Sequence, residues 1–176
     1  MIEVFATLIL LFVAILLLFV IVTAAFYILD LFFELPYVTT DRKKIDTILE
    51  FANIKKGETI VDLGSGDGRL LFASANCGAM PIGYEINPAL IALTIFHAKL
   101  KGLEKQITVK NESLWKADLK VADVIFVYAY RKTMKKFEDL VFKNAKKGTR
   151  IVVNTNPFPN KKPIKSENGI YLYIVK

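Results

Sequence analysis

The stretch from Thr59 to Leu71 reads TIVDLGSGDGRLL, and its glycines limit what the chain around it can form. An apolar, β-branched run leads into glycines at positions 64, 66 and 68, and helix-forming residues follow. Glycine tolerates the positive φ angles that a tight strand-to-helix turn requires, and free backbone amides at a helix start can face a ligand. A strand, a glycine-rich loop and a helix in this order predict an α/β fold with a ligand at the loop.

Strand-like and helix-like segments alternate along the rest of the chain. Short apolar runs predict strands, and segments with helical periodicity between them predict helices. The expected strands are 58–63, 80–86, 106–110, 122–128, 149–154 and 169–176, and the expected helices are 41–52, 68–77, 88–102 and 133–148. This order favours a Rossmann-like α/β domain in which helices cover both faces of a mostly parallel sheet.

The N-terminal segment from Val4 to Leu29 is apolar except for Thr7 and Thr23. A membrane span needs about 20 such residues, so this segment predicts one N-terminal transmembrane helix. A cleaved signal peptide is the competing interpretation, but the chain starts Met1-Ile2-Glu3 and lacks the basic region that such peptides carry. A buried core helix would need more partner surface than the remaining chain supplies.

Charge is distributed unevenly between the two expected parts. Residues 1–35 are the expected anchor and short linker, and they hold no Lys or Arg. Residues 36–176 are the expected domain, and they carry 24 basic and 14 acidic residues, a net charge of +10. The cations nearest the apolar segment are Arg42, Lys43 and Lys44 on its C-terminal side. The positive-inside rule therefore predicts a single-pass membrane protein whose domain faces the cytoplasm. The basic domain favours anionic partners, which include inner-leaflet headgroups, acidic protein and nucleic acid.

Three acids are associated with the glycine loop. Asp62 ends the first strand, Asp67 lies in the loop and Glu85 ends the second strand. Carboxylates suit a cofactor with a sulfonium, an amino group and ribose hydroxyls better than one with phosphates. The dinucleotide spacing G-x-G-x-x-G and the P-loop lysine are both missing. No metal site is expected, because Cys77 is the only cysteine and a clustered thiolate site is excluded.

These motifs resemble those of a known superfamily. VDLGSGDGRL followed by GYEINP is similar to the first two motifs of the seven-strand (class I) S-adenosylmethionine-dependent methyltransferases. More narrowly, PYVTTDRKKIDTIL, GYEINPALIALTIFHAKL and ESLWKADL, after a hydrophobic segment, resemble one family. It comprises the mitochondrial lysine methyltransferases of the adenine nucleotide translocase and the ATP synthase c-subunit, with compact archaeal protein-lysine methyltransferases. The resemblance covers roughly residues 36–153.

The resemblance implies a trimmed version of the seven-strand fold. It implies a mostly parallel sheet with an antiparallel C-terminal strand, formed here by 169–176. The helices that usually follow the third and fifth strands are not expected, because residues 111–123 and 156–168 are too short or too rich in proline. S-adenosylmethionine is the implied cofactor.

Cofactor-binding roles transfer to the positions that match the family's motifs. These positions are Asp62, Gly64, Ser65, Gly66, Asp67, Gly68, Glu85, Asn87, Glu112 and Ser113. Glu85 is the expected ribose-binding acid, and Asn87 is expected to border the ribose. Relatives often have Asp or Asn at position 113, near the adenine amine, so the choice between Glu112 and Ser113 for the adenine contact stays open.

Methyl transfer to a lysine asks mainly for alignment and for loss of the amine proton, since a free lysine has a pKa near 10.4. Aromatic walls and uncharged acceptors favour the neutral amine. Tyr128 and Tyr130 follow the fourth strand, Asn154 ends the fifth, and Tyr37 precedes the domain's first helix. We expect these four residues to line a lysine channel, with strand-end packing as the alternative.

The resemblance implies a protein lysine as methyl acceptor. Because residues 30–36 reach at most about 25 Å, we expect that acceptor to belong to a membrane protein. A small-molecule or lipid amine methyltransferase would share the cofactor site. A nucleic-acid methyltransferase is disfavoured, because VYAY stands where its motif would follow the fourth strand. A cofactor-binding protein without catalysis is a further alternative.

Overall fold

A computed structural model describes residues 2–32 and 42–176, which fall into two compact units, Met1–Val38 and Thr39–Lys176. The first unit contains one helix, α1 (Ile2–Phe32). Its segment Val4–Ala24 is long and apolar enough to cross a membrane, and none of it is buried within the chain. A signal sequence passes the same test, so α1 is a candidate span by length and composition.

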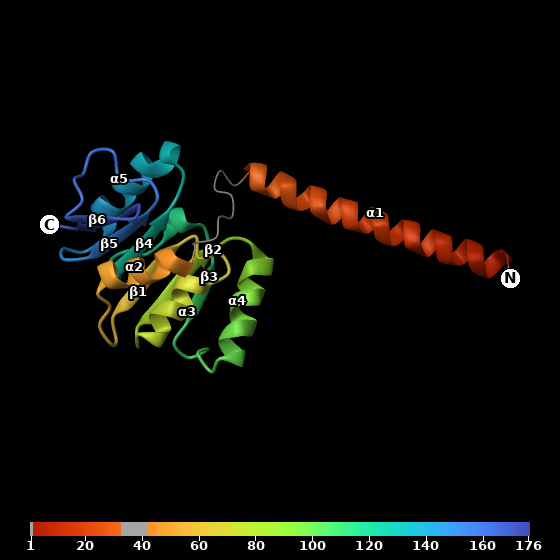
Figure 1. Cartoon of the computed structure of the whole chain (residues 1–176), viewed down its shortest axis with the longest axis horizontal. Coiled ribbons are helices and arrows are strands. Elements are labelled where there is room, and N and C mark those ends of the chain that lie inside the picture. The colour runs from red at the N-terminus through yellow and green to blue at the C-terminus, as the bar shows by residue number, and fades with distance from the viewer. Residues whose placement is uncertain (1, 33–41) are drawn as a thin grey trace. The chain divides into compact units, whose positions relative to one another are not determined.

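The second unit is built on one seven-stranded sheet with the order β3-β2-β1-β4-β5-β7-β6 (Figure 1). Its strands are β1 (Thr59–Leu63), β2 (Met80–Glu85), β3 (Thr108–Asn111), β4 (Val124–Tyr128), β5 (Arg150–Asn154), β6 (Lys165–Glu167) and β7 (Ile170–Ile174). Neighbouring strands from β3 to β5 are parallel, and β7 is antiparallel to both β5 and β6. The predicted mostly parallel sheet with an antiparallel C-terminal strand is confirmed.

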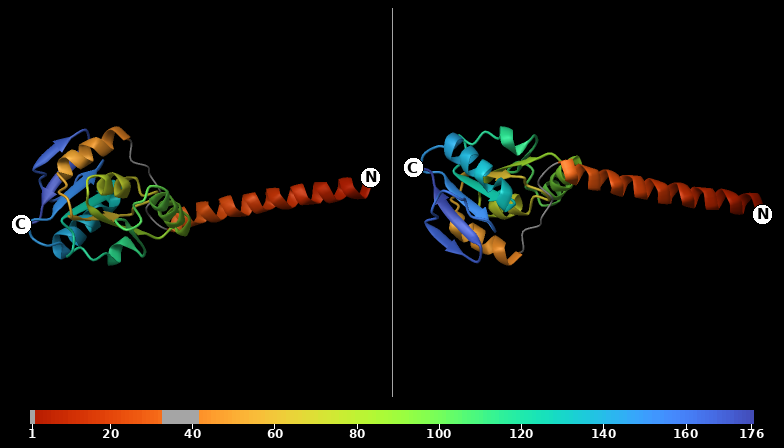
Figure 2. Two further views of the ribbon diagram at one scale, coloured as in Figure 1. Left: turned by 90° about the horizontal axis from the view of Figure 1, so that it is seen from below. Right: turned by 90° about the horizontal axis from the view of Figure 1, so that it is seen from above.

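Helices cover both faces of this sheet. On one face, α2 (Arg42–Ala52) contacts β5 and β7, α3 (Arg69–Asn76) contacts β1 and β2, and α4 (Pro88–Leu100) contacts β2 and β3. The remaining long helix, α5 (Met134–Asn144), lies on the opposite face from α2, as Figure 2 shows. The short elements η1 (Leu114–Lys116) and η2 (Arg131–Thr133) are single 3₁₀ turns.

One core cluster lies between the sheet and α2. Ile48 and Phe51 of α2 pack there with Val124 and Phe126 of β4, and all four are buried. Side chains alternate along a strand, so β4 sends its other apolar residues to the α5 side. Each such buried side chain contributes roughly 1.5–3 kcal/mol to folding, and this packing fixes α2 against β4 and β5.

The fold is trimmed as predicted. The 3₁₀ turn η1 takes the place of a helix between β3 and β4, and the described residues between β5 and β6 form no helix. Strand β6 was not predicted, because Lys165–Glu167 is short, polar and exposed and is recognisable only by its pairing with β7. The turn that joins these two strands contains Asn168 and Gly169, both with positive φ, which suits a tight hairpin.

Strand β2 makes room for the glycine loop at Gly83. A Cβ added there would lie 2.5 Å from Ser65 Oγ and 2.8 Å from Leu71 Cδ1. Such distances are well inside van der Waals contact, so the loop and the start of α3 rest directly on the β2 backbone. Gly83 is thus required by space, because its own φ is not positive.

Gly83→Ala should therefore lower thermal stability more than Gly102→Ala. The first variant overpacks the loop, and contacts as short as 2.5 Å place its cost toward the upper end of about 1–3 kcal/mol. The second has nothing within 4 Å and carries only the strain of its positive φ, about 1–2 kcal/mol. Thermal unfolding of the detergent-solubilised chain, followed by Trp115 fluorescence, measures both. An equal or smaller loss for Gly83→Ala would contradict the close packing.

Candidate functional site

The glycine loop joins β1 to α3 and is pressed between β2 and α4. Gly64, Gly66 and Gly68 have φ angles of 92°, 55° and 78°, which side chains rarely adopt. The Gly64 amide donates to the Tyr84 carbonyl oxygen at 3.0 Å. A Cβ at Gly68 would lie 2.6 Å from the Thr94 methyl carbon, so α4 leaves no room for a side chain there.

The Glu85 carboxylate holds this loop in place. Its Oε2 accepts from the Gly66 amide at 2.9 Å, and its Oε1 accepts from the Ile86 and Asn87 amides, both at 2.8 Å. Asn87 in turn caps α4 by accepting from the Ala89 amide at 3.0 Å. A carboxylate offers about four acceptor positions, so these bonds leave capacity for a ligand hydroxyl. The predicted ribose-binding acid thus also organises the backbone around it, which its position in the sequence did not reveal.

Asp62 is a buried carboxyl at the end of β1, with only 6% of its surface exposed. Burial, with the nearby Glu85 and Asp67 carboxylates, raises the pKa of the Asp62 carboxyl from 3.8 to about 7. The Asp67 carboxylate forms an ion pair with Arg69 at 2.6 Å. A buried acid beside two further carboxylates favours a cationic ligand, because a cation would offset their mutual repulsion.

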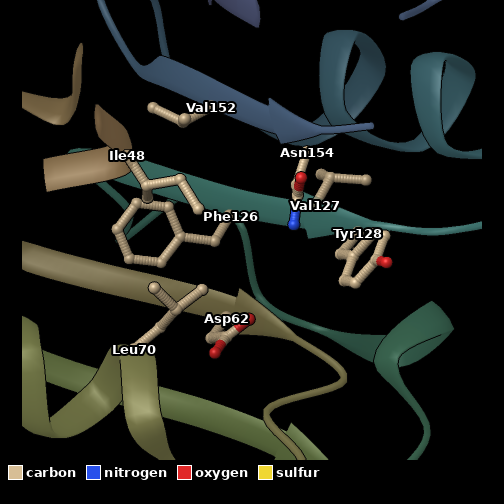
Figure 3. Close-up of a pocket in the computed structure, with 8 residues that line it drawn as sticks. All are labelled: Ile48, Asp62, Leu70, Phe126, Val127, Tyr128, Val152 and Asn154. Carbon is tan, nitrogen blue, oxygen red and sulfur yellow. The ribbon is translucent and has the colours of Figure 1, made fainter. Parts of the chain in front are cut away.

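Asp62, Tyr128 and Asn154 line one small pocket (Figure 3). They stand at the C-terminal ends of the adjacent parallel strands β1, β4 and β5, and Tyr128 is the register partner of Asn154. The other lining residues are apolar and are Ile48, Leu70, Phe126, Val127 and Val152. Three of the predicted site residues therefore share one pocket whose remaining wall is apolar.

Asn154 is 3% exposed and has a partner that sequence reasoning missed. Its Oδ1 accepts from Lys44 Nζ at 3.3 Å and from the Thr155 hydroxyl at 2.9 Å. Lys44 Nζ also donates to Thr155 Oγ1 at 3.2 Å, and Thr155 has a φ of 72°, an unusual angle for a β-branched residue. Because Lys44 lies far away in the sequence, only the packing of α2 on β5 could reveal this contact.

The remaining cofactor candidates lie around Glu85 and the loop. The Glu112 amide donates to the Glu85 carbonyl oxygen at 3.1 Å, so Glu112 follows β3 beside the end of β2. Ser113 precedes η1 and is half-buried. Ser65 is buried, and within the described residues its Oγ has no hydrogen-bond partner.

One predicted channel residue, Tyr130, does not line the pocket of Asp62. Tyr130 is 45% exposed, and it lies on the loop after β4. That loop is tied to the loop after β5, because Asn156 Nδ2 donates to the Ala129 carbonyl oxygen at 2.9 Å. Tyr37 lies outside the described residues.

A sequence profile of the ANTKMT methyltransferase domain matches residues 62–165, more than half of the chain. The chain belongs to this family. The adenine nucleotide translocase lysine N-methyltransferase of Mus musculus is 31% identical over 132 residues, covering 74% of this chain and 57% of that protein. The ATP synthase c-subunit lysine N-methyltransferase of Homo sapiens is 27% identical over 129 residues, covering 73% and 55%. The chain thus spans little more than half the length of these two ANTKMT-type relatives.

Two further proteins are similar to this chain over nearly their whole length. A protein-lysine N-methyltransferase of Saccharolobus islandicus is 27% identical over 154 residues, which cover 80% of this chain and 94% of that protein. The solved RNA methyltransferase of Salinibacter ruber, in complex with S-adenosyl-L-homocysteine, has a TM-score of 0.74 and 27% identity and covers 78% and 94%. The ANTKMT-family domain of this chain accordingly has the S-adenosylmethionine-dependent methyltransferase fold, and its cofactor is S-adenosylmethionine.

The affinity for S-adenosylmethionine should rise with pH around neutrality. In the free protein Asp62 gains its charge only as pH rises through about 7, and the ionised carboxylate attracts the sulfonium cation. From about pH 5.5 to about pH 7.5 the association constant should increase roughly twentyfold, because the bound cation holds the carboxyl ionised. Isothermal titration calorimetry measures this change.

Two controls isolate the charge of Asp62. Asp62→Asn should bind more weakly near pH 7.5 and show little pH dependence. S-adenosylhomocysteine lacks the sulfonium charge, so its binding to the unaltered chain should vary less with pH. An equal pH dependence for both ligands, or for Asp62→Asn, would rule out this role.

Proposed function

We propose that the chain is a membrane-anchored methyltransferase that transfers a methyl group from S-adenosylmethionine to a lysine side chain of a protein. The observation that carries this proposal is membership of the ANTKMT family over residues 62–165. The relatives named above are all lysine methyltransferases of proteins, apart from the one from Salinibacter ruber. The pocket that joins the ends of β1, β4 and β5 supports the same reaction.

The cofactor would lie over the glycine loop, held by Gly64, Gly66 and Gly68 on its backbone side. Asp62 would face its positive charge, and Glu85 would accept from its ribose. The fit rests on two features: the loop excludes side chains, and the acids around it suit a cation better than a phosphate. Ser65, Asp67, Asn87, Glu112 and Ser113 complete the proposed binding set.

When bound, S-adenosylmethionine supplies a methyl group on a sulfonium; the S–CH₃ bond breaks as an N–CH₃ bond forms. The acceptor lysine must first lose a proton to water, which the domain's residues would favour, and S-adenosylhomocysteine would then leave as the second product. Tyr128 and Asn154 offer uncharged oxygen acceptors beside apolar side chains, where a charged ammonium is disfavoured. Lys44 Nζ donates to the Asn154 amide oxygen in the free chain, so the acceptor lysine would have to take its place there. Tyr130 and Tyr37 would form the outer part of the channel.

The proposed anchor is residues 1–35, followed by the catalytic domain at 36–176. The candidate span Val4–Ala24 supports a single-pass protein, and the basic run Arg42 to Lys44 supports a domain on the cytoplasmic side. Residues 30–36 reach at most about 25 Å, which would keep the domain near the bilayer. We therefore infer that the acceptor lysine belongs to an integral or membrane-attached protein.

One observation favours a second candidate function. The solved relative from Salinibacter ruber is named as an RNA methyltransferase, and the domain of this chain carries a net charge of +10. Basic surfaces bind nucleic acid without sequence preference. RNA methylation is therefore the alternative that the first experiment must separate from protein methylation.

Radiolabelled methyl should pass from S-adenosylmethionine to a discrete protein band when the full chain is mixed with a matched membrane fraction. The products are separated into protein, lipid and nucleic acid, and the protein is hydrolysed to reveal methyl-lysine. Glu85→Ala should abolish labelling, because it removes the acceptor for three backbone amides. Glu104→Ala, which removes an exposed acid, is the matched control and should retain labelling. Label in RNA or in lipid would overturn the proposal.

Tyr128→Phe should lower kcat about tenfold and leave the affinity for S-adenosylmethionine nearly unchanged, because it deletes one hydroxyl beside the acceptor amine. Its pH profile should also shift upward, since deprotonation of the lysine becomes harder. Tyr171→Phe removes a hydroxyl from β7, outside the pocket lining, and should behave like the unaltered chain. Full turnover by Tyr128→Phe would instead favour strand-end packing as the role of Tyr128.

A further inference from the structure

Helix α4 is apolar on the side that the domain does not cover. Only Thr94 and Ala98 of α4 are buried. Its exposed large apolar residues are Leu93, Ile95, Phe96 and Leu100, which are 40%, 43%, 58% and 69% exposed. A surface helix normally carries polar residues on its outer face, so this helix departs from the rule. An outward row of large apolar side chains marks an interaction surface.

Five exposed residues form a continuous stripe along α4. Ala89, Ala92, Leu93, Phe96 and Leu100 recur at three- and four-residue intervals, so they share one side of the helix. We call these residues the α4 stripe. The helix packs on β2 and β3 at one edge of the sheet (Figure 1), so the stripe faces away from the rest of the domain.

The charges around the stripe favour an anionic lipid surface as its partner. Lys99 and Lys101 lie at the C-terminal end of α4, and no acidic residue occurs between positions 88 and 103. Lysines beside an apolar face can extend to headgroup phosphates while the apolar face enters the acyl boundary. A second copy of this chain fits less well, because two domains of net charge +10 would repel each other.

The candidate span brings such a surface within reach. Residues 33–41 lie between α1 and α2 and extend to roughly 30 Å at most. Tethering turns a second, weak membrane contact into an intramolecular step with a high effective concentration. A short stripe that would bind vesicles poorly by itself can therefore stay bound when α1 spans the same bilayer.

We propose that the α4 stripe lies in the headgroup region of an anionic membrane, as a second membrane contact of the chain. This contact goes beyond methyl transfer and does not depend on which molecule accepts the methyl group. It would hold the domain in one orientation, because the other end of α4 is fixed to Glu85 through Asn87.

Fluorescence quenching in vesicles tests the contact with the full chain. Cys77 is the only cysteine, so Cys77→Ser allows single reporters at Phe96→Cys or at Ile164→Cys. Ile164 is the matched control, because it is 63% exposed, apolar and next to β6 at the opposite edge of the sheet. Each reporter carries the polarity-sensitive dye NBD, and the vesicles contain phosphatidylcholine, phosphatidylglycerol and lipids with brominated acyl chains.

The reporter at position 96 should show a blue shift and at least about a twofold loss of fluorescence with brominated lipid, because an interfacial helix lies roughly 5–10 Å into the acyl boundary. The reporter at position 164 should show neither change. Adding Leu100→Glu should reduce the quenching at position 96. Omitting phosphatidylglycerol should do the same.

Three results would overturn the proposal. Equal quenching at both positions would indicate unspecific adsorption. A lack of quenching at position 96 would show that the stripe stays in water. A blue shift at position 96 without quenching by brominated lipid would show that protein, and not lipid, covers the α4 stripe. Washing the vesicles at alkaline pH tests the α1 span separately, and the activity of the labelled chains tests the proposed function, so each failure is distinguishable.

Discussion

The Glu85 carboxylate is the contact on which the cofactor site depends. It accepts from Gly66 on the loop after β1 and from Ile86 and Asn87 at the turn into α4, so one side chain joins two crossovers of the sheet. Hydrogen bonds to a carboxylate are about twice as strong as neutral ones, which suits a loop whose φ angles are otherwise unfavourable. The loop is therefore set before any ligand arrives.

The domain keeps charge at this edge of the sheet at a cost to its own stability. Burial raises the pKa of Asp62 to about 7, so ionising it near neutrality weakens the fold: the folded state holds a proton that the unfolded chain releases above about pH 4. This destabilisation grows as pH rises from about 4 to about 7. A cationic ligand reverses it, which links the binding of the ligand to the stability of the domain.

Local patterns were enough to predict most of the fold. The glycines of the loop, Pro88 at a helix start and the apolar strands are each recognisable within a few residues, and their alternation predicts a mostly parallel sheet. Contacts between segments that are distant in the sequence could not be predicted from such local patterns. Lys44 meets Asn154 only because α2 packs on β5, and the three hydrogen bonds of Glu85 depend on a turn that its neighbours' identities do not encode. The acids Asp62 and Glu85 were correctly expected at the ends of the first two strands. The raised pKa of the Asp62 carboxyl could not be predicted, because it depends mainly on burial.

The apolar character of α4 links the edge of the sheet to the cofactor loop. Thr94 is a polar residue in this apolar helix, and its side chain lies against the loop, donating to the Gly66 carbonyl oxygen at 3.4 Å. The opposite side of α4 carries the stripe. The helix that carries the proposed membrane surface therefore also packs closely on the loop, because Thr94 leaves no room for a side chain at Gly68. Membrane attachment and cofactor geometry are then two properties of the same helix.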